Sequence, residues 1–350
     1  MLRKQDILLE KWLNEFKSPN TRKVYKSGIR DFAKKMNITD LEEYVLGSPD
    51  VTSDLRKYLR LIQERPTKTI HTYIASVKSF LQDNGVKIPD TEWKKLKRRG
   101  FMPKRIRAET RDRAPTKQQL KKVLQYVDIK GKALILFLAS SGARIGETLS
   151  IPISDFNLES DPPRVFIKNK FTKDGVGERT VFFSYEARDA LKAWLAIKDK
   201  MGKRDGSTHK DPRMFPFVQN TANDLLQRAF DKAGLGEKDK RTNRRIYHLH
   251  SFRKFFRTKI GLDLDMTNSL LGHCEYLDSS YLRQEEEEIA KAYLEAMPNV
   301  SVYELQNQEL KEKTVNLEDE NRELRERLAD HDARMAKIEN MLEQLLNEKA

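Results

Sequence analysis

Four short segments of this chain contain the kinds of side chain that can break a phosphodiester bond without a metal ion. Such a reaction needs a nucleophile, cations that neutralise the phosphoryl oxygens, and a proton for the leaving hydroxyl. Tyrosine can supply the nucleophile, the planar fork of arginine can bind two oxygens at once, and histidine or lysine can move protons. The four segments hold all of these groups: SSGARIGETLSI at 140–151, NKFTKDGVGERTVFF at 169–183, HLHSFRKFFRT at 248–258 and LLGHCEYLDSSYLR at 270–283.

The region before these segments has an apolar spacing that predicts helices only. Within residues 4–16, one helical stripe is formed by Ile7, Leu8, Trp12, Leu13 and Phe16. Further helices fit residues 21–35, 50–63 and 67–83, and Asn84-Gly85 ends the last of them. We therefore predict an all-helical domain over residues 1–86.

A strongly basic stretch follows at residues 87–113. It is poorly periodic and is interrupted by Gly100 and Pro103, so it is typical of a linker that crosses or wraps a polyanion. A disordered tether that becomes ordered on DNA is a compatible reading. The candidate phosphate-binding residues in this stretch are Lys94, Lys95, Lys97, Arg98, Arg99, Lys104, Arg105 and Arg107.

A second domain is predicted over residues 114–298, and it contains all four segments. Thr116 is a suitable cap for a helix at 117–127, and two β-rich runs within 164–183 surround Asp174-Gly175, which is a hairpin signal. Further helices fit residues 132–140, 185–199, 220–233 and 250–261. The chain is thus expected to be mainly α with a small β-hairpin.

The last part of the chain, residues 299–350, has the pattern of a coiled coil. One seven-residue register holds Leu310, Leu317, Leu324, Ile338 and Leu345 with His331 as the interruption, and the other holds Thr314, Asn321, Leu328, Met335 and Leu342. Flanking residues are opposite in charge in the parallel pairing, and the seam residue Asn321 favours two strands. We predict a parallel homodimer; a single solvated amphipathic helix is the alternative.

Composition bounds the class of protein. The chain has 350 residues and a net charge of +14; residues 301–350 carry eight Lys or Arg and thirteen Asp or Glu, so the first 300 residues carry +19. That excess is expected of a protein that binds a phosphate backbone. No apolar run could span a membrane, the N-terminus does not resemble a signal peptide, and the single Cys274 can form no internal disulfide. We expect a cytoplasmic, nucleoid-associated protein.

The order of the four segments resembles that of the tyrosine recombinase (phage integrase) family, including its Xer-type and archaeal members. The similarity covers residues 5 to 297: LEKWLNEFKSPNTRKVYKSGIRDFAKKM resembles the family's helical, SAM-like core-binding domain, and RDRAPTKQQLKKVL resembles the entry to its mixed α/β catalytic domain. Residues 1–86 would then bind DNA and residues 114–298 would carry out catalysis. A C-terminal coiled coil is not a usual feature of this family.

The resemblance implies a role for six residues. Arg144 and Arg253 match the phosphate-clamping arginines, Lys173 the lysine that protonates the leaving oxygen, His250 and His273 the two histidines, and Tyr281 the nucleophile. Lys170 or Lys168 could replace Lys173, His248 is a rival only in a shifted pairing, and Tyr276 is a minor rival because Tyr281 stands eight positions after His273 where nine is commoner. Arg144 could instead form a helix-surface pair with Glu147.

What the resemblance implies is a site-specific recombinase. It would cleave and rejoin double-stranded attachment sites through a 3′-phosphotyrosyl intermediate and a Holliday junction, as a homotetramer, with no metal, ATP or other cofactor. Residues 284–297 would be the helix that docks on a neighbouring protomer. Two alternatives remain at this point: a related strand transferase, such as a type IB topoisomerase or telomere resolvase, and a non-catalytic architectural DNA-binding protein.

Overall fold

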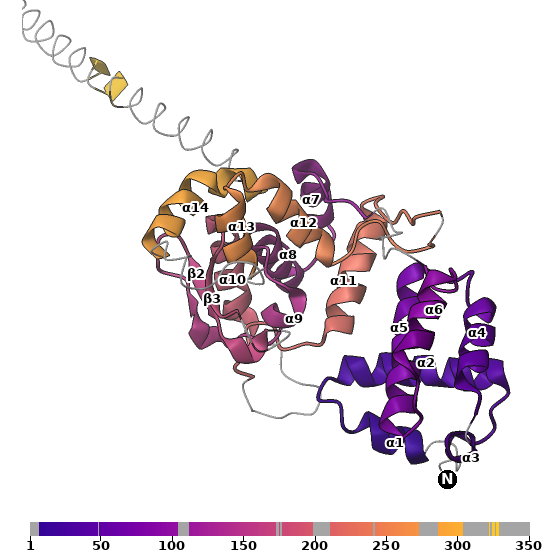
Figure 1. Cartoon of the computed structure of the whole chain (residues 1–350). Coiled ribbons are helices and arrows are strands. Elements are labelled where there is room, and N and C mark those ends of the chain that lie inside the picture. The colour runs from indigo at the N-terminus through magenta and orange to yellow at the C-terminus, as the bar shows by residue number, and fades with distance from the viewer. Residues whose placement is uncertain are drawn as a thin grey trace, which may run out of the picture. The chain divides into compact units, whose positions relative to one another are not determined.

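The computed structural model divides into two compact units (Figure 1). It describes residues 7–47, 49–103, 112–172, 175, 177–198, 211–240, 242–272 and 286–303, together with Arg322, Leu324, Arg325, Arg327 and Leu328. Unit 1 comprises Met1–Arg111 and Lys238–Arg244, and unit 2 comprises Asp112–Glu237 and Arg245–Ala350. The change from one unit to the other at residue 111 falls inside the predicted linker of 87–113.

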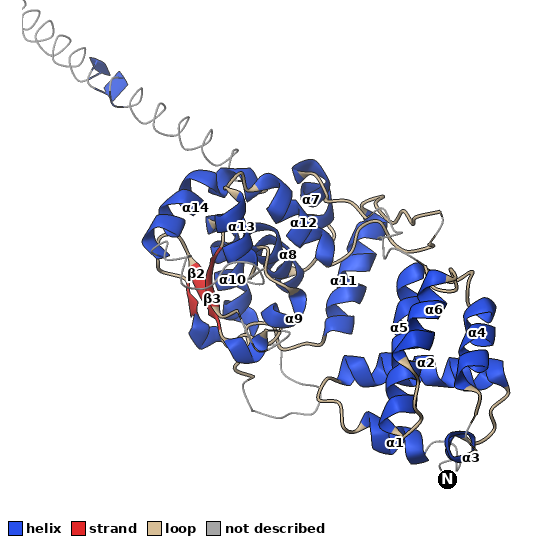
Figure 2. Ribbon diagram, in the orientation of Figure 1, coloured by secondary structure: helices blue, strands red, loops and turns tan. Residues whose placement is uncertain are grey.

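The N-terminal part of unit 1 is built from helices, which Figure 2 shows in blue. They are α1 (Ile7–Leu13), α2 (Pro19–Met36), α3 (Leu41–Leu46), α4 (Val51–Leu61), α5 (Thr67–Asp83) and α6 (Asp90–Arg98). The Ser18 side chain accepts a hydrogen bond from the backbone N–H of Thr21 and so caps the start of α2. Trp12 and Phe32 lie in a single buried core, at 3% and 1% exposure.

The first half of the predicted linker is a folded part of unit 1, which corrects that prediction for residues 87–103. Helix α6 buries Leu96, and Met102 follows it into the same core. Nζ of Lys78 lies over the ring of Trp93, 4.8 Å from its centre. One apolar residue per turn is enough to fix a short helix against a larger core, although five basic residues around it conceal the periodicity.

Unit 2 is a helical body with one small sheet (Figure 2). Its helices are α7 (Lys117–Leu124), α8 (Ile129–Ser141), α9 (Ile145–Thr148), α10 (Tyr185–Lys198), α11 (Gln219–Lys232), α12 (His250–Lys259), α13 (Leu264–Leu271) and α14 (Glu286–Val300). Helix α8 lies in the middle of the unit, and every residue from Ala133 to Ala139 is buried. The apolar character of this helix on all sides is therefore explained by its central position, packed against α10 and α12.

The sheet has three antiparallel strands in the order β1-β2-β3. The predicted hairpin is confirmed as β2 (Arg164–Ile167) and β3 (Arg179–Phe182), which pair so that Val165 lies opposite Val181. The short strand β1 (Phe156–Asn157) was not predicted, because two residues give no alternating pattern. The prediction of a mainly helical chain with a small sheet is confirmed.

Helix α14 packs on its own unit, whereas the family resemblance led us to expect this segment on a neighbouring protomer. Tyr293 is fully buried, and its hydroxyl donates to the carbonyl of Ser140 at 2.8 Å. After the helix, the Glu186 carboxylate accepts hydrogen bonds from the backbone N–H groups of Val302 and Tyr303. The expected coiled coil lies almost entirely outside the described residues, so its pairing stays a prediction. No helix among the described residues is long and apolar enough to cross a membrane.

Candidate active site

The turn before Arg144 is set by a glycine that no other residue could replace without a clash. Helix α8 ends at Gly142, whose φ of 64° is left-handed. A Cβ at this position would lie 2.6 Å from the ring of Phe256, which comes from α12. The chain can therefore turn sharply over α12 and begin α9 at Arg144.

Arg144 is held in place by the buried carboxylate of Glu147. Its Nη1 donates to Oε1 of Glu147 at 2.9 Å, and its backbone N–H points to Oε2 of the same residue at 3.3 Å. Glu147 is only 2% exposed, so the pair that it forms with Arg144 is not the solvent-exposed helix-surface pair considered above. Burial raises the pKa of Glu147, but Arg179 and then Arg144 outweigh it, and the pKa lies below its usual range.

Arg253 lies at the centre of the same group. Its Nη1 donates to the carbonyl of Gly142 at 2.9 Å and its Nη2 donates to the carbonyl of Leu271. The side chain is buried, at 5% exposure for the residue. Burial first, and then the charges of Arg144 and Arg179, lower the pKa of Arg253 below its usual range. Crowding of cations that lowers a pKa in this way also creates an attraction for an anion.

His250 lies one helical turn before Arg253 on α12, and its side chain is exposed. The backbone N–H of His250 points to Nδ1 of His248 at 3.3 Å, so that Nε2 of His248 carries the proton and donates to Asp112 at 3.2 Å. Lys254 donates to the other oxygen of Asp112 at 2.6 Å. His248 is thereby engaged in holding the start of α12.

The protonation of His250 follows from its surroundings. Desolvation first, and then the neighbouring Arg253, His248 and Lys254, lower the pKa of His250 below its usual value, while Asp112 opposes this shift. The imidazole is therefore neutral at pH 7, the state in which it can accept a proton.

The described lysines of the hairpin region are both engaged. Nζ of Lys168 pairs with Oδ1 of Asp155 at 2.7 Å, and Nζ of Lys170 lies 4.9 Å from the ring centre of Phe171. Which of Lys168, Lys170 and Lys173 moves the proton stays a prediction. Lys173 lies outside the described residues, as do His273, Tyr276 and Tyr281.

The chain leading to His273 is nonetheless fixed up to the residue before it. Helix α13 ends at Gly272, with φ 65°, and the carbonyls of Leu270 and Leu271 are held by Arg179 and Arg253. Three of the six predicted catalytic residues, Arg144, His250 and Arg253, are thus brought into one cluster, which borders Gly272 at the end of α13.

Sequence reasoning missed Arg179, the second partner of Glu147. The signal was available: in the β3 segment RTVF, Arg179 shares the inward face with Val181, and both are buried. A charged residue on the apolar face of a strand requires a buried partner.

The predicted DNA-binding residues separate into two groups. Lys94, Lys97, Arg98 and Arg99 are exposed on α6 or at its C-terminal cap, and Lys95 is half-buried and paired with Glu92. Lys104, Arg105 and Arg107 lie outside the described residues.

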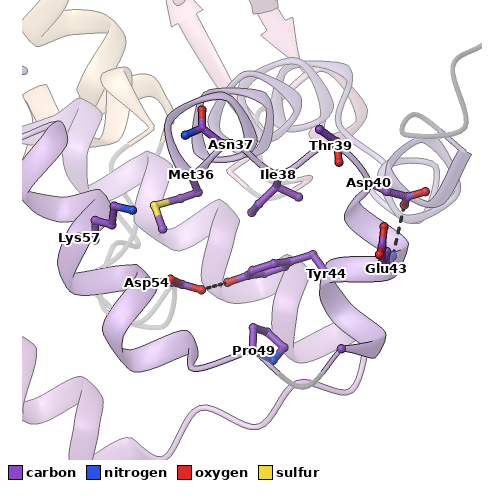
Figure 3. Close-up of a pocket in the computed structure, with 11 residues that line it drawn as sticks. Met36, Asn37, Ile38, Thr39, Asp40, Glu43, Tyr44, Pro49, Asp54 and Lys57 are labelled. Carbon is purple, nitrogen blue, oxygen red and sulfur yellow. Dashed lines mark hydrogen bonds between the residues drawn. The ribbon is translucent and has the colours of Figure 1, made fainter.

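Unit 1 contains a cavity of about 460 Å³ whose lining does not suit a phosphate (Figure 3). Its charged side chains are Asp40, Glu43, Asp54 and Lys57, an excess of negative charge. The Tyr44 hydroxyl donates to Asp54 at 2.7 Å across it. Across the part of the chain that the structure describes, no group of three or more His, Cys, Asp or Glu side chains could hold a metal ion.

Comparison with known proteins agrees with the geometry of unit 2. Residues 114–285 match the phage integrase family. The tyrosine recombinase XerA of Saccharolobus solfataricus is 26% identical over 293 residues, covering 80% of this chain and 88% of the relative. The tyrosine recombinase XerC of Bacillus licheniformis is 27% identical over 292 residues, covering 78% and 89%. Residues 114–285 therefore belong to the phage integrase family, and both of these relatives are tyrosine recombinases.

The fold of this tyrosine recombinase is also that of solved integrases. A lambda integrase tetramer bound to a Holliday junction is similar with a TM-score of 0.54 and 15% identity, over 78% of each chain. Both relatives named above are tyrosine recombinases by name. Neither a topoisomerase nor a purely architectural protein is therefore favoured.

Proposed function

We propose that this recombinase cuts and rejoins DNA at specific sites through a covalent bond to Tyr281. The observation that carries the proposal is the convergence of Arg144, at the start of α9, with His250 and Arg253, both on α12, into one basic cluster that borders Gly272. Two arginines in one desolvated cluster suit a transferring phosphoryl group, whose oxygens gain charge in the transition state.

The proposed reaction balances without a cofactor. The phenol oxygen of Tyr281 bonds to phosphorus as its proton passes to His250, and the bond between phosphorus and the 5′-oxygen breaks. The leaving 5′-oxygen takes a proton from Lys173, and the 3′-phosphate stays on Tyr281. Arg144 and Arg253 bind the two non-bridging oxygens, and His273 donates a hydrogen bond to one of them. The reverse attack by a 5′-hydroxyl reseals the strand.

The proposed partners are duplex attachment sites and further copies of the chain. A lambda integrase structure holds a tetramer on a Holliday junction, and we extend that arrangement to this chain. Unit 1 would bind DNA through exposed cations of α6, and the tail would pair two chains.

A nicked duplex that carries the chain's own attachment site tests the proposal. The nick lets the cut fragment diffuse away, so the covalent intermediate accumulates and runs as a larger band on a denaturing gel. We expect this band to appear in EDTA as well as in Mg²⁺. Specific binding without any adduct would instead indicate an architectural protein.

The cations of α6 should contribute to the salt dependence of DNA binding. We expect the triple substitution Lys94→Gln, Lys97→Gln and Arg98→Gln to reduce the slope of log affinity against log salt by about 3, because each phosphate contact releases about one counterion. The slope is measured by fluorescence anisotropy on duplex DNA. A matched control replaces Arg322, Arg325 and Arg327 by Gln, which changes the net charge equally. Equal slopes for the two variants would remove α6 from the interface.

The tail should form a dimer by itself. We expect a peptide of residues 301–350 to sediment as a parallel dimer, and Asn321→Leu to raise its melting temperature while admitting larger assemblies, since a polar seam residue lowers stability and restricts oligomer choice. Deleting residues 304–350 from the protein should leave cleavage of the nicked duplex intact and weaken the pairing of two DNA sites. A peptide that stays monomeric at high micromolar concentration contradicts the proposal.

A further inference from the structure

A buried arginine outside the predicted catalytic set joins three segments of the site. Arg179 is 9% exposed and comes from β3. Its Nε donates to the carbonyl of Leu270 at 2.9 Å, Nη1 donates to the carbonyl of Gly177 at 3.2 Å, and Nη2 donates to Oε2 of Glu147 at 2.8 Å. One guanidinium therefore connects the hairpin, the end of α13 and the residue that supports Arg144.

The fit around this guanidinium is close. A Cβ added to Gly272 would lie 2.7 Å from Nη1 of Arg179, so a side chain at this position would displace the guanidinium from its present place. The left-handed φ of Gly272 is a second reason for glycine at this position. Through its bond to Leu270, Arg179 also holds the end of α13, and His273 is the next residue of the sequence after Gly272.

The charges around Glu147 give Arg179 a second effect. The two oxygens of this buried carboxylate face different partners, Oε1 towards Arg144 and Oε2 towards Arg179. Arg144, Arg179, Arg253 and Glu147 together carry a net charge of +2. If Arg179 were neutral, the full charge of Glu147 would act on Arg144, and the group would carry only +1.

We propose that Arg179 is a positioning residue that neutralises Glu147, so that Arg144 keeps its full positive charge for the scissile phosphate. The inference rests on the proposed function, in which Arg144 clamps that phosphate. Arg179 touches no reacting atom and acts through Glu147. A role limited to packing would need the shape and hydrogen bonds of Arg179 and would be indifferent to the charge of Glu147.

Three variants of the full chain separate these roles: Arg179→Gln, Glu147→Gln, and the two combined. On the nicked duplex we expect Arg179→Gln to cut at least about tenfold more slowly, with DNA affinity unchanged within about twofold, because only the transition state gains the extra charge. The combined variant should recover to within about threefold of Glu147→Gln, because neutralising both residues restores the net charge of +2. A combined variant as slow as Arg179→Gln overturns the proposal.

A second substrate gives a readout that packing cannot change. Replacing a non-bridging oxygen of the scissile phosphate by methyl removes the negative charge that Arg144 would bind. On this substrate the tenfold defect of Arg179→Gln should shrink to within about twofold of the parent chain. A defect of unchanged size on the neutral substrate would also overturn the proposal.

Three controls distinguish a failure of the role of Arg179 from a failure to fold and from a failure of the proposed phosphate clamp. Thermal unfolding identifies a variant that fails to fold, and Arg179→Lys, which keeps the charge, should then retain a cutting rate within about fivefold of the parent. If Arg144→Ala slows cutting and Arg179→Gln does not, only the role of Arg179 is wrong. If Arg144→Ala itself cuts normally, the proposed function of the clamp fails as well.

Discussion

Tyr281→Phe should bind duplex DNA as the parent chain does and form no covalent adduct. The substitution removes a single phenol oxygen, which is the atom that would bond to phosphorus. Arg144, Arg253 and the cations of α6 stay in place, so the electrostatic part of binding is unaffected. The adduct is measured on the nicked duplex by denaturing gel, and binding is measured on the same duplex by anisotropy. We expect no adduct above the detection limit, because no other group takes over the bond that the phenol oxygen would form to phosphorus.

Tyr276→Phe is the matched control, because it removes the same atom five residues earlier. We expect it to cut at a rate within about threefold of the parent chain, since a residue without a covalent role affects only local packing. If Tyr276→Phe loses the adduct and Tyr281→Phe keeps it, the nucleophile has been assigned to the wrong tyrosine. Peptide mapping of the adduct formed by the parent chain gives an independent answer.

Local spacing in the sequence was enough to find part of the site. His250 and Arg253 are three residues apart on α12, and Arg144 stands at the start of α9, two residues after Gly142, which ends α8. Such patterns depend on neighbours within one turn, so they can be recognised before the fold is known. The helical character of unit 1 and the β2–β3 hairpin were predictable for the same reason.

What the sequence could not give are the contacts between distant segments. Glu147 meets Arg179 across 32 positions, and Asp112 meets His248 across 136. No periodicity relates such pairs, since the fold alone brings them together. Helix α6 was missed for a related reason. Its single buried residue, Leu96, packs into a core formed by other helices of unit 1, and the sequence of α6 alone does not show that core. The catalytic roles of all six residues, Arg144, Lys173, His250, Arg253, His273 and Tyr281, stay predictions.

Arg144→Ala and Arg253→Ala should each slow cleavage by on the order of a hundredfold or more, with much smaller losses of DNA affinity. Each guanidinium would face oxygens whose negative charge grows in the transition state, so its removal affects the chemical step more than ground-state binding. Single-turnover cutting of the nicked duplex measures the first effect, and anisotropy measures the second. Equal losses of rate and affinity would indicate that these arginines contribute only to DNA binding.

The structure predicts that the two variants differ in stability. Arg253 is buried and donates to the carbonyls of Gly142 and Leu271, so Arg253→Ala leaves buried acceptors without a donor, at a cost of about 1–3 kcal/mol each. The Arg144 side chain is 34% exposed, and its partner Glu147 keeps Arg179, so Arg144→Ala should change the free energy of unfolding by less than about 1 kcal/mol. Thermal or urea unfolding of the full chain measures the difference. Because Arg144→Ala should fold as well as the parent chain and still fail to cut, it is the cleaner test of the phosphate clamp. Similar destabilisation of both variants would mean that Arg144 also supports the fold, and its effect on cleavage could then not be assigned to charge alone.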